Sequence, residues 1–307
     1  MKILITGADG FIGSHLAKKL INEKNNVFCL DIKNQNKLLR INELRHKNNF
    51  NYVKLDVSNR SKFKNFLINH NFHTIFHFAS IVGVENYIKN PIDVIKFNIE
   101  STLTLLDTLK NRNTHIIFSS TSEVFGKNPK KNWNEDSDRI TGSSKIPRWS
   151  YSASKNLCEH LYFSYHLKFN TKITIVRFFN AYGPLQNPIY VVSKSIQNLL
   201  DNKKPFIYDN GYQTRSFTFI DDITNALLKI IGNKKTFGNS YNIGNNKEIK
   251  IREVVDYLSR IFNKPGFYKN INTKKMYGNL YEDIPKRSLN NSKAKRDLKW
   301  SPKINYK

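Results

Sequence analysis

The chain has 307 residues, 39% of them hydrophobic, so it is long enough to bury a full core as one large domain or two closely packed ones. It carries 50 Lys+Arg against 24 Asp+Glu, but the lysines are scattered among asparagines, as at residues 33–37 and 128–132, which argues against nucleic-acid binding. No run approaches the ~18 apolar residues of a membrane span, and the first residues lead straight into a motif without room for a signal peptide, so we expect a cytoplasmic protein without membrane contact.

The first half of the chain alternates strand and helix patterns. Strands are expected at residues 2–6, 26–31, 51–56, 73–78, 114–119 and 172–178, and amphipathic helices at 12–23, 60–69, 92–110 and 152–169. Right-handed crossovers would place these helices on both faces of one sheet. The pattern therefore predicts an α/β fold, a Rossmann-type doubly wound parallel sheet.

From about Pro184 the pattern loosens. Helices are expected at 191–202, 221–231 and 251–262, with short strands at 206–208 and 240–243. We predict a smaller C-terminal α/β lobe over residues 184–307, after a Rossmann domain over 1–183 that receives later chain crossings. Residues 127–148 are predicted to be a surface loop near the site.

The two cysteines, Cys29 and Cys158, stand in apolar contexts without the spacing of a metal or redox pair. We expect buried free thiols and no metal site.

A glycine motif, Gly7-Ala8-Asp9-Gly10-Phe11-Ile12-Gly13, follows the first strand and opens the first helix. Gly7 permits the tight turn, Gly10 lets the backbone approach a pyrophosphate, and Gly13 allows close packing of helix on strand. The helix beginning at Phe11 and Ile12 offers N–H donors to phosphates. This arrangement predicts a dinucleotide site.

An acid at the end of the second strand, Asp31, identifies the dinucleotide. Its carboxylate can accept hydrogen bonds from both ribose hydroxyls and would repel a 2′-phosphate, so NAD is preferred over NADP. Asp56 and Val57, at the end of the third strand, are candidates to meet the adenine ring. A simple helix cap before Asn59 explains them nearly as well.

Tyr151 and Lys155 lie four residues apart, hence on one face of a helix. We expect the ammonium to lower the pKa of the phenol, so that Tyr151 can act as a base. Residues 119–126, Ser-Ser-Thr-Ser-Glu-Val-Phe-Gly, follow the fifth strand, and ligands bind at the carboxyl ends of strands in such sheets.

Together these motifs resemble the extended short-chain dehydrogenase/reductase family, from Lys2 to about Pro302. The other matching pieces are residues 77–80, His-Phe-Ala-Ser; Asn98; residues 177–184, Arg-Phe-Phe-Asn-Ala-Tyr-Gly-Pro; and residues 213–217, Gln-Thr-Arg-Ser-Phe. The resemblance implies an NAD-dependent enzyme acting on a nucleotide-diphosphate sugar, with a UDP-sugar favoured. It also implies a homodimer built through the helices at 92–110 and 152–169.

The resemblance assigns roles residue by residue. Thr121 is the hydroxyl partner of a Thr/Tyr/Lys triad, and Lys155 also holds the nicotinamide ribose. The cofactor pocket includes Phe78, Ala79 and Ser80, and the substrate site includes Ser122, Asn180, Arg215 and Arg287. Simpler structural roles stay open for Asn98 and Asn180, and Arg215 and Arg287 could be solvated charges.

By resemblance, Tyr151 takes the proton of the sugar 4-hydroxyl while carbon 4 is oxidised, giving a 4-keto intermediate. Thr121-Ser122-Glu123 is similar to the trio of UDP-glucuronic acid decarboxylases and GDP-mannose 4,6-dehydratases, and residues 145–151 are similar to decarboxylases and related 4-epimerases. UDP-glucuronate decarboxylation with recycled, tightly held NAD is favoured over 4-epimerisation or 4,6-dehydration. Glu123 is either an acid/base or an anchor of the active-site loop.

One position departs from the pattern of the family. Leu185 stands where the family usually has Arg after Gly183-Pro184, so a phosphate contact is missing or supplied by a lysine.

The non-enzyme alternative is a Rossmann-fold regulator that senses NAD. The joint presence of Thr121, Tyr151 and Lys155 argues against it.

Overall fold

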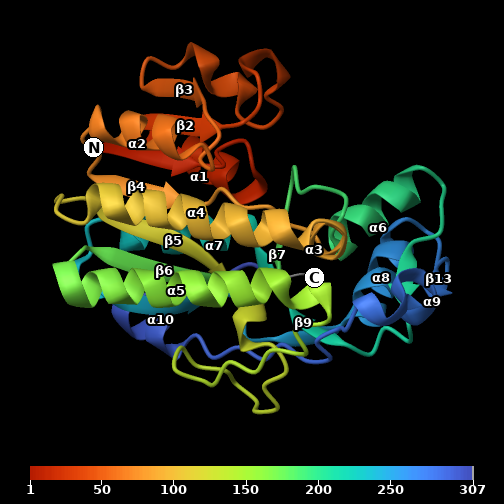
Figure 1. Ribbon diagram of the computed structural model, residues 1–307. Helices are drawn as coiled ribbons and strands as arrows, with labels where there is room; N and C mark the ends of the chain where they lie inside the picture. Colours follow the sequence, from red (N-terminus) through yellow and green to blue (C-terminus); the bar gives the residue numbers. More distant parts are fainter. Residues whose placement is uncertain (306–307) are drawn as a thin grey trace.

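The computed structural model describes residues 1–305, and its centre is a sheet of seven parallel strands (Figure 1). The strand order is β11-β6-β5-β4-β1-β2-β3. The strands span Lys2–Thr6 (β1), Asn26–Asp31 (β2), Phe50–Lys54 (β3), Thr74–His77 (β4), His115–Thr121 (β5), Ile173–Phe178 (β6) and Asn239–Ile243 (β11). This order, with β1 in the interior and crossovers on both sides, confirms the predicted doubly wound fold.

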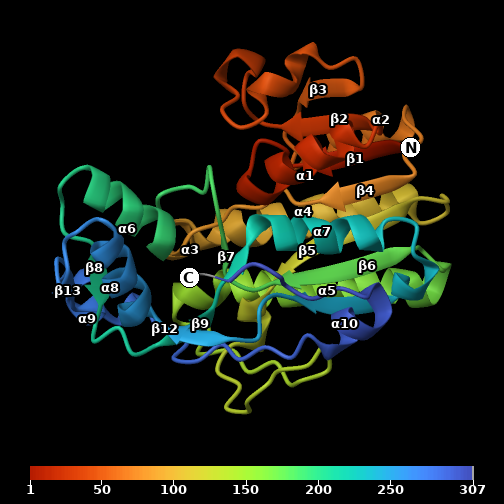
Figure 2. The same cartoon turned by 180° about the vertical axis from the view of Figure 1, so that it is seen from behind.

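Helices cover both faces of the sheet, as comparison of Figures 1 and 2 shows. One layer holds α2 (Arg60–Ile68), α4 (Pro91–Leu109) and α5 (Ser150–Phe169), and the other holds α1 (Phe11–Asn22), α7 (Ile220–Ile230) and α10 (Ser292–Leu298). Alternation along β1 divides the core accordingly: Leu4 packs with the first layer, and Ile3 and Ile5 pack with the second.

A short helix, α3 (Val84–Lys89), lies between β4 and α4 and was not predicted. It has only six residues, too few for a helical period to stand out in the sequence. Gly83 precedes it with φ +108°, a backbone angle that side chains rarely permit.

The smaller lobe lies at the carboxyl end of the sheet and contains α6 (Val191–Leu200), α8 (Ile251–Ile261) and α9 (Thr273–Tyr277). Three two-stranded pairs accompany it: β7 (Ala181–Tyr182) with β10 (Thr218–Phe219), β9 (Thr214–Ser216) with β12 (Glu248–Lys250), and β8 (Phe206–Tyr208) with β13 (Lys269–Ile271). A separate apolar cluster that includes Ile207, Phe217 and Val255 stabilises it.

Two elements that the sequence groups with the lobe, one strand and one helix, are instead part of the large sheet and of a helix layer that covers it. Strand β11 pairs in parallel with β6, and α7 packs against α1. Both bury apolar side chains, among them Tyr241 and Leu227, in the core of the second helix layer. Tertiary packing thus decides their position, and the boundary near residue 183 stays a prediction.

Residues 127–148 form a largely exposed loop, as the sequence predicts, but a few of their side chains are buried. Trp133 is 1% exposed, and its backbone bonds both Ser288 and Asn290. The buried carboxylate of Glu135 accepts a hydrogen bond from the Asn242 N–H. One large apolar side chain and one buried acid therefore anchor this irregular loop to the rest of the protein.

Cys29 and Cys158 are buried free thiols, as predicted. Within residues 1–305, no helix combines the length and apolar character that crossing a bilayer requires.

Candidate active site

The glycine motif forms a close turn between β1 and α1. Gly7 has φ +69°, and a Cβ there would lie 2.9 Å from the Ala79 nitrogen, while a Cβ on Gly13 would lie 2.5 Å from the Gly7 oxygen. Gly10 is the N-cap of α1 and supplies no side-chain cap, so the first N–H groups of the helix face the cavity. These features fit the pyrophosphate of a dinucleotide.

Asp31 ends β2 next to this turn, and its carboxylate accepts the N–H of Asp9 at 3.0 Å. Asp56 is exposed, and its carboxylate accepts bonds from the amide and hydroxyl of Ser58. Val57 is buried in the core. These contacts give Asp56 and Val57 structural roles, and their contact with adenine stays a prediction.

Lys155 lies on α5 and is 1% exposed. Its ammonium donates a hydrogen bond to the Ser119 carbonyl at 2.9 Å and lies 5.9 Å from the centre of the Tyr151 ring. Burial lowers the pKa of Lys155 to about 8. Helix α5 therefore brings the predicted pair to the carboxyl end of β5, although the ammonium is directed at the strand.

Tyr151 is buried, and its ring stacks on Tyr87 with centroids 4.5 Å apart. Burial raises the pKa of the phenol above its ordinary value, and the Glu123 carboxylate raises it further, against smaller opposite effects of Ser80 and Arg148. The groups that shift this pKa most do not include Lys155, so the lowering expected from its ammonium stays a prediction.

Asn98 connects Ser80, in the segment after β4, to helix α5. The Ser80 hydroxyl donates to Asn98 Oδ1 at 2.9 Å, and Asn98 Nδ2 donates to the Ser154 hydroxyl at 3.0 Å. Asn98 is 2% exposed, so these bonds fix its orientation. Asn98 therefore joins helices α4 and α5, the structural role left open for it, and also bonds to Ser80.

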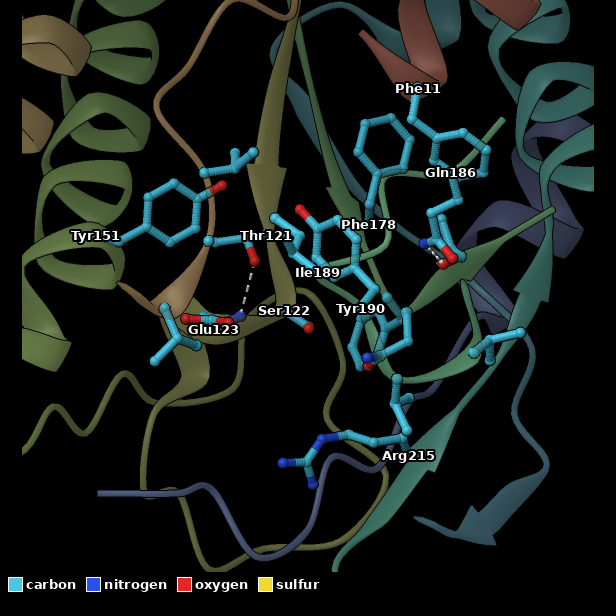
Figure 3. A pocket seen from close by; sticks show the side chains of 18 of the residues that line it. Phe11, Thr121, Ser122, Glu123, Tyr151, Phe178, Gln186, Ile189, Tyr190 and Arg215 are labelled. Atoms are coloured by element: carbon cyan, nitrogen blue, oxygen red, sulfur yellow. Dashed lines mark hydrogen bonds between the residues drawn. The ribbon is translucent and has the colours of Figure 1, made fainter. Parts of the chain in front are cut away.

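Thr121, Ser122 and Glu123 begin the turn after β5, where the Thr121 hydroxyl accepts the Glu123 N–H at 3.2 Å. Figure 3 shows Thr121 and Glu123 beside Tyr151, with Arg215 across the cavity. The Glu123 carboxylate pairs with Arg148 at 2.7 Å and Arg287 at 3.2 Å. Burial alone would raise its pKa, but the two guanidinium groups lower it to about 2. Glu123 is therefore an ionised, doubly paired carboxylate.

Arginines dominate the charge of this region. Arg215 is 6% exposed and pairs with Asp283 at 2.8 Å. Burial and the neighbouring Arg287 lower the pKa of Arg215 to about 10. The buried Nε atoms of Arg148 and Arg287 have no hydrogen-bond partner among residues 1–305. Arg215 and Arg287 are thus not the solvated charges that the sequence left possible.

One cavity of about 400 Å³ brings most of the predicted residues together. Its lining includes Gly7, Gly10, Phe11, Ile12, Gly13, Phe78, Ser80, Thr121, Ser122, Glu123, Tyr151, Asn180, Arg215 and Arg287. Ala79 and Lys155 lie directly behind this lining, where Ala79 contacts Gly7 and Lys155 contacts Ser119. Asn180 Oδ1 is buried without a hydrogen-bond partner within the described chain.

Several lining residues were missed by the sequence analysis: Tyr87, Arg148, Gln186, Tyr190, Lys194 and Tyr281. Arg148 stands three residues before Tyr151, in the 3-10 turn Pro147–Trp149 that leads into α5, so its closeness to the Tyr151 motif was a signal in the sequence. Lys194, on α6, is the kind of lysine that could replace the arginine absent at Leu185. Tyr87 lies on the unpredicted α3, so no signal indicated it.

A family model described as GDP-mannose 4,6 dehydratase matches residues 4–307. The chain belongs to this family of extended short-chain dehydrogenase/reductase enzymes, as the motifs predicted. It is 31% identical to a UDP-N-acetyl-alpha-D-glucosaminuronate decarboxylase of Bacillus cytotoxicus, over 99% of this chain and 94% of that protein.

Two other proteins are similar at this level. The bifunctional polymyxin resistance protein ArnA of Wigglesworthia glossinidia brevipalpis is 33% identical over 98% of this chain, which spans 49% of that longer protein. The solved UDP-glucuronic acid 4-epimerase of Bacillus cereus, in complex with UDP-glucuronic acid and NAD, is 30% identical with a TM-score of 0.88. That comparison covers 99% of this chain and 95% of the epimerase.

Proposed function

We propose that this protein is an NAD-dependent enzyme that decarboxylates a UDP-linked hexuronate through a 4-keto intermediate. UDP-glucuronate is the substrate that the sequence favours. UDP-N-acetylglucosaminuronate joins it as a candidate because the relative from Bacillus cytotoxicus bears the name of a decarboxylase for that sugar.

The observation that carries the proposal is the surplus of cationic over anionic side chains in the lining of the cavity. Four cationic side chains line the cavity, Arg148, Lys194, Arg215 and Arg287, against the carboxylates of Glu123 and Asp283. The unpaired Nε atoms of Arg148 and Arg287 leave buried donors for an anion. A UDP-hexuronate offers these cations two kinds of anionic group, the diphosphate and the carboxylate of the sugar.

The cofactor side has a defined set of residues. Gly7, Gly10, Gly13 and the start of α1 would hold the pyrophosphate, and Asp31 would hold the adenosine ribose. NAD+, when bound, supplies the hydride acceptor for the oxidation of carbon 4.

The protein side chains act on the sugar. Tyr151 removes the proton of the 4-hydroxyl, with the Thr121 hydroxyl holding the same oxygen and Lys155 stabilising the phenolate. Asn180, Arg215 and Ser122 hold the diphosphate and the sugar. The 4-keto group makes the carboxylate on carbon 5 a β-keto acid, which loses carbon dioxide as the electron pair of the broken bond passes into an enolate at carbons 4 and 5. A proton then adds at carbon 5, and no proton has to be removed from carbon.

The state of Glu123 argues against 4,6-dehydration. Dehydration needs a base that removes the proton at carbon 5, and a carboxylate with a pKa of about 2 between two guanidinium groups is a weak base. Decarboxylation has no such requirement. The pairing of Glu123 instead suits a residue that orients Arg148 and Arg287 toward the substrate.

A second candidate is 4-epimerisation of the same uronate, which is favoured by the similarity to the UDP-glucuronic acid 4-epimerase. It shares the oxidation at carbon 4 and the recognition of the carboxylate. The two reactions differ in whether carbon dioxide is released.

The test is a proton NMR time course of the purified protein with NAD+ and, in separate tubes, UDP-glucuronate, UDP-N-acetylglucosaminuronate, UDP-glucose, GDP-mannose and dTDP-glucose. We expect a new anomeric signal and release of carbon dioxide with one of the uronates. A new anomeric signal without carbon dioxide would assign epimerisation. Turnover of only the neutral sugars would contradict the proposal. No reaction in any tube would favour the alternative that the protein is an NAD-sensing regulator.

A further inference from the structure

Asp9 lies inside the glycine motif, between Gly7 and Gly10, and its side chain is fully buried. A buried carboxylate is stable only with several donors around it. Asp9 has four: Oδ1 accepts the N–H groups of Arg40 and Ile41 at 2.8 and 3.2 Å, and Oδ2 accepts the Leu39 N–H at 3.3 Å and the Lys33 ammonium at 2.6 Å. Burial opposes ionisation, but Lys33 and these amides lower the pKa of Asp9.

The donors to the Asp9 carboxylate all lie in one segment, residues 33–41, which begins two residues after Asp31. Its other anchors are Leu38 and Ile41, which are buried in the core. Arg40 extends the contact to the second lobe, because its Nη1 donates to the Asp9 carbonyl at 3.1 Å and its Nε donates to the Leu185 carbonyl at 2.8 Å. Asp9 is thus the point at which the glycine turn, the segment after Asp31 and the lobe meet.

Asp9 also touches the predicted ribose ligand, because its N–H donates to Asp31 Oδ2 at 3.0 Å. The Lys33 ammonium and the Asp31 carboxylate thus contact the same residue, one at the side chain of Asp9 and the other at its backbone N–H. The Lys33 side chain is 36% exposed, so it can move if its partner is lost. A free lysine at this position would offer a charge-assisted contact to a 2′-phosphate.

We propose that Asp9 is a specificity-determining residue for the cofactor: by binding Lys33, it withholds from a 2′-phosphate the cation that would otherwise accept NADP. Asp31 repels the phosphate directly, and Asp9 removes the nearby positive charge. The inference rests on NAD as the proposed cofactor and is independent of which sugar reaction follows.

The test is displacement of NADH from the holoprotein by NAD+ or NADP+, followed by nicotinamide fluorescence. In the Asp9→Asn variant the amide oxygen can still accept the Arg40 and Ile41 N–H groups, but the charge that holds Lys33 is gone. We expect the ratio of the dissociation constants for NADP+ and NAD+ to fall by about tenfold, the effect of one new charge-assisted contact to a phosphate.

The double variant Asp9→Asn/Lys33→Ala identifies the cation responsible. Its ratio is expected to return to that of the unaltered protein, because no lysine is left to move. A ratio unchanged in Asp9→Asn would overturn the proposal, as would a fall that persists in the double variant. Weaker binding of both dinucleotides with an unchanged ratio would mean that Asp9 only anchors the segment.

The matched control is Glu43→Gln, because Glu43 forms an exposed ion pair with Lys18 at 2.6 Å close to the same segment. It removes one negative charge without touching the glycine turn, so its ratio should stay unchanged. Thermal unfolding of each variant, with and without NADH, checks that the fold is intact.

Discussion

At the residue scale, Tyr151 combines a chemical role with a deeply buried position. The phenol is surrounded by the Tyr87 ring and the Glu123 carboxylate, and its pKa is raised. The proposed role of Tyr151 as a base therefore requires that this pKa fall when the ligands are bound. The sequence identified the residue from spacing, but its electrostatic surroundings come from elements that no local pattern connects.

We predict that Tyr151→Phe lowers kcat by at least about 100-fold, because the variant has no group to take the proton of the 4-hydroxyl. Initial rates with the responsive nucleotide sugar measure this. The control is Tyr165→Phe on the same helix, which loses only an exposed hydrogen bond to Asp107. An active Tyr151→Phe enzyme would contradict the proposed mechanism.

Arg215 leads to a prediction about binding. Its guanidinium is buried, paired with Asp283 and adjacent to Arg287, which is costly unless an anion completes the group. Arg215→Lys keeps the charge but loses the planar donor fork, so KM for the nucleotide sugar should rise about tenfold or more with a smaller change in kcat. Arg260→Lys, at an exposed ion pair on α8, should leave KM unchanged.

At the element scale, β4 carries a buried imidazole that connects β1 to α4. His77 bonds the Thr6 hydroxyl at 3.1 Å and the Ser101 hydroxyl at 3.3 Å. Burial lowers its pKa to about 3, with a further contribution from Lys155. The folded protein therefore binds fewer protons than the unfolded chain between pH 6.5 and 3.

The sign of this linkage makes His77 a source of acid sensitivity. The stability due to the neutral imidazole is present above pH 6.5 and is lost as the pH falls toward 3. His77→Asn should reduce the loss of unfolding free energy between pH 7 and pH 5 by about 2 kcal/mol. Urea unfolding at the two pH values measures this, and His160→Gln, at an exposed position on α5, should show the unaltered dependence.

The loop at residues 127–148 gives a second prediction at this scale. Trp133 is buried and stacks on Phe125 with centroids 5.0 Å apart. Trp133→Ala should lower the free energy of unfolding by about 3 to 5 kcal/mol, as expected for removal of a buried aromatic side chain. Lys131→Ala, at an exposed position two residues earlier, should change it by less than about 0.5 kcal/mol. Equal stability of the two variants would mean that the loop is not anchored by Trp133.

At the scale of the whole molecule, α4 and α5 pack side by side on one face of the sheet. They still expose Ile92 and Ile95 on α4 and Leu157 and Leu167 on α5. A homodimer through these helices, implied by the family resemblance, would cover such side chains.

We predict a dimeric mass in light scattering coupled to size-exclusion chromatography, and a shift toward the monomer in Leu157→Lys, because a charge would be buried in the interface. Leu200→Lys, at a comparably exposed leucine on α6, should not change the mass. A monomeric unaltered protein would rule out this assembly.

The sequence by itself determined the α/β class, the glycine turn, Asp31, the Tyr151/Lys155 pair and the family, because each depends on spacing within a few residues or on a motif at the end of a strand. Most of the residues that it assigned to the site line the cavity. Local periodicity was sufficient for long helices and buried strands, and insufficient for the six-residue α3.

Only the tertiary structure decided that β11 joins the large sheet, that Glu123 is locked between Arg148 and Arg287, and that Asp9 holds Lys33. Glu123 and Arg287 lie 164 residues apart in the chain, and no pattern along the sequence encodes such a pair. The physical reason is that burial and charge pairing depend on which elements pack together. The same carboxylate would be a solvated acid on a surface and is a fixed counter-ion inside this cavity.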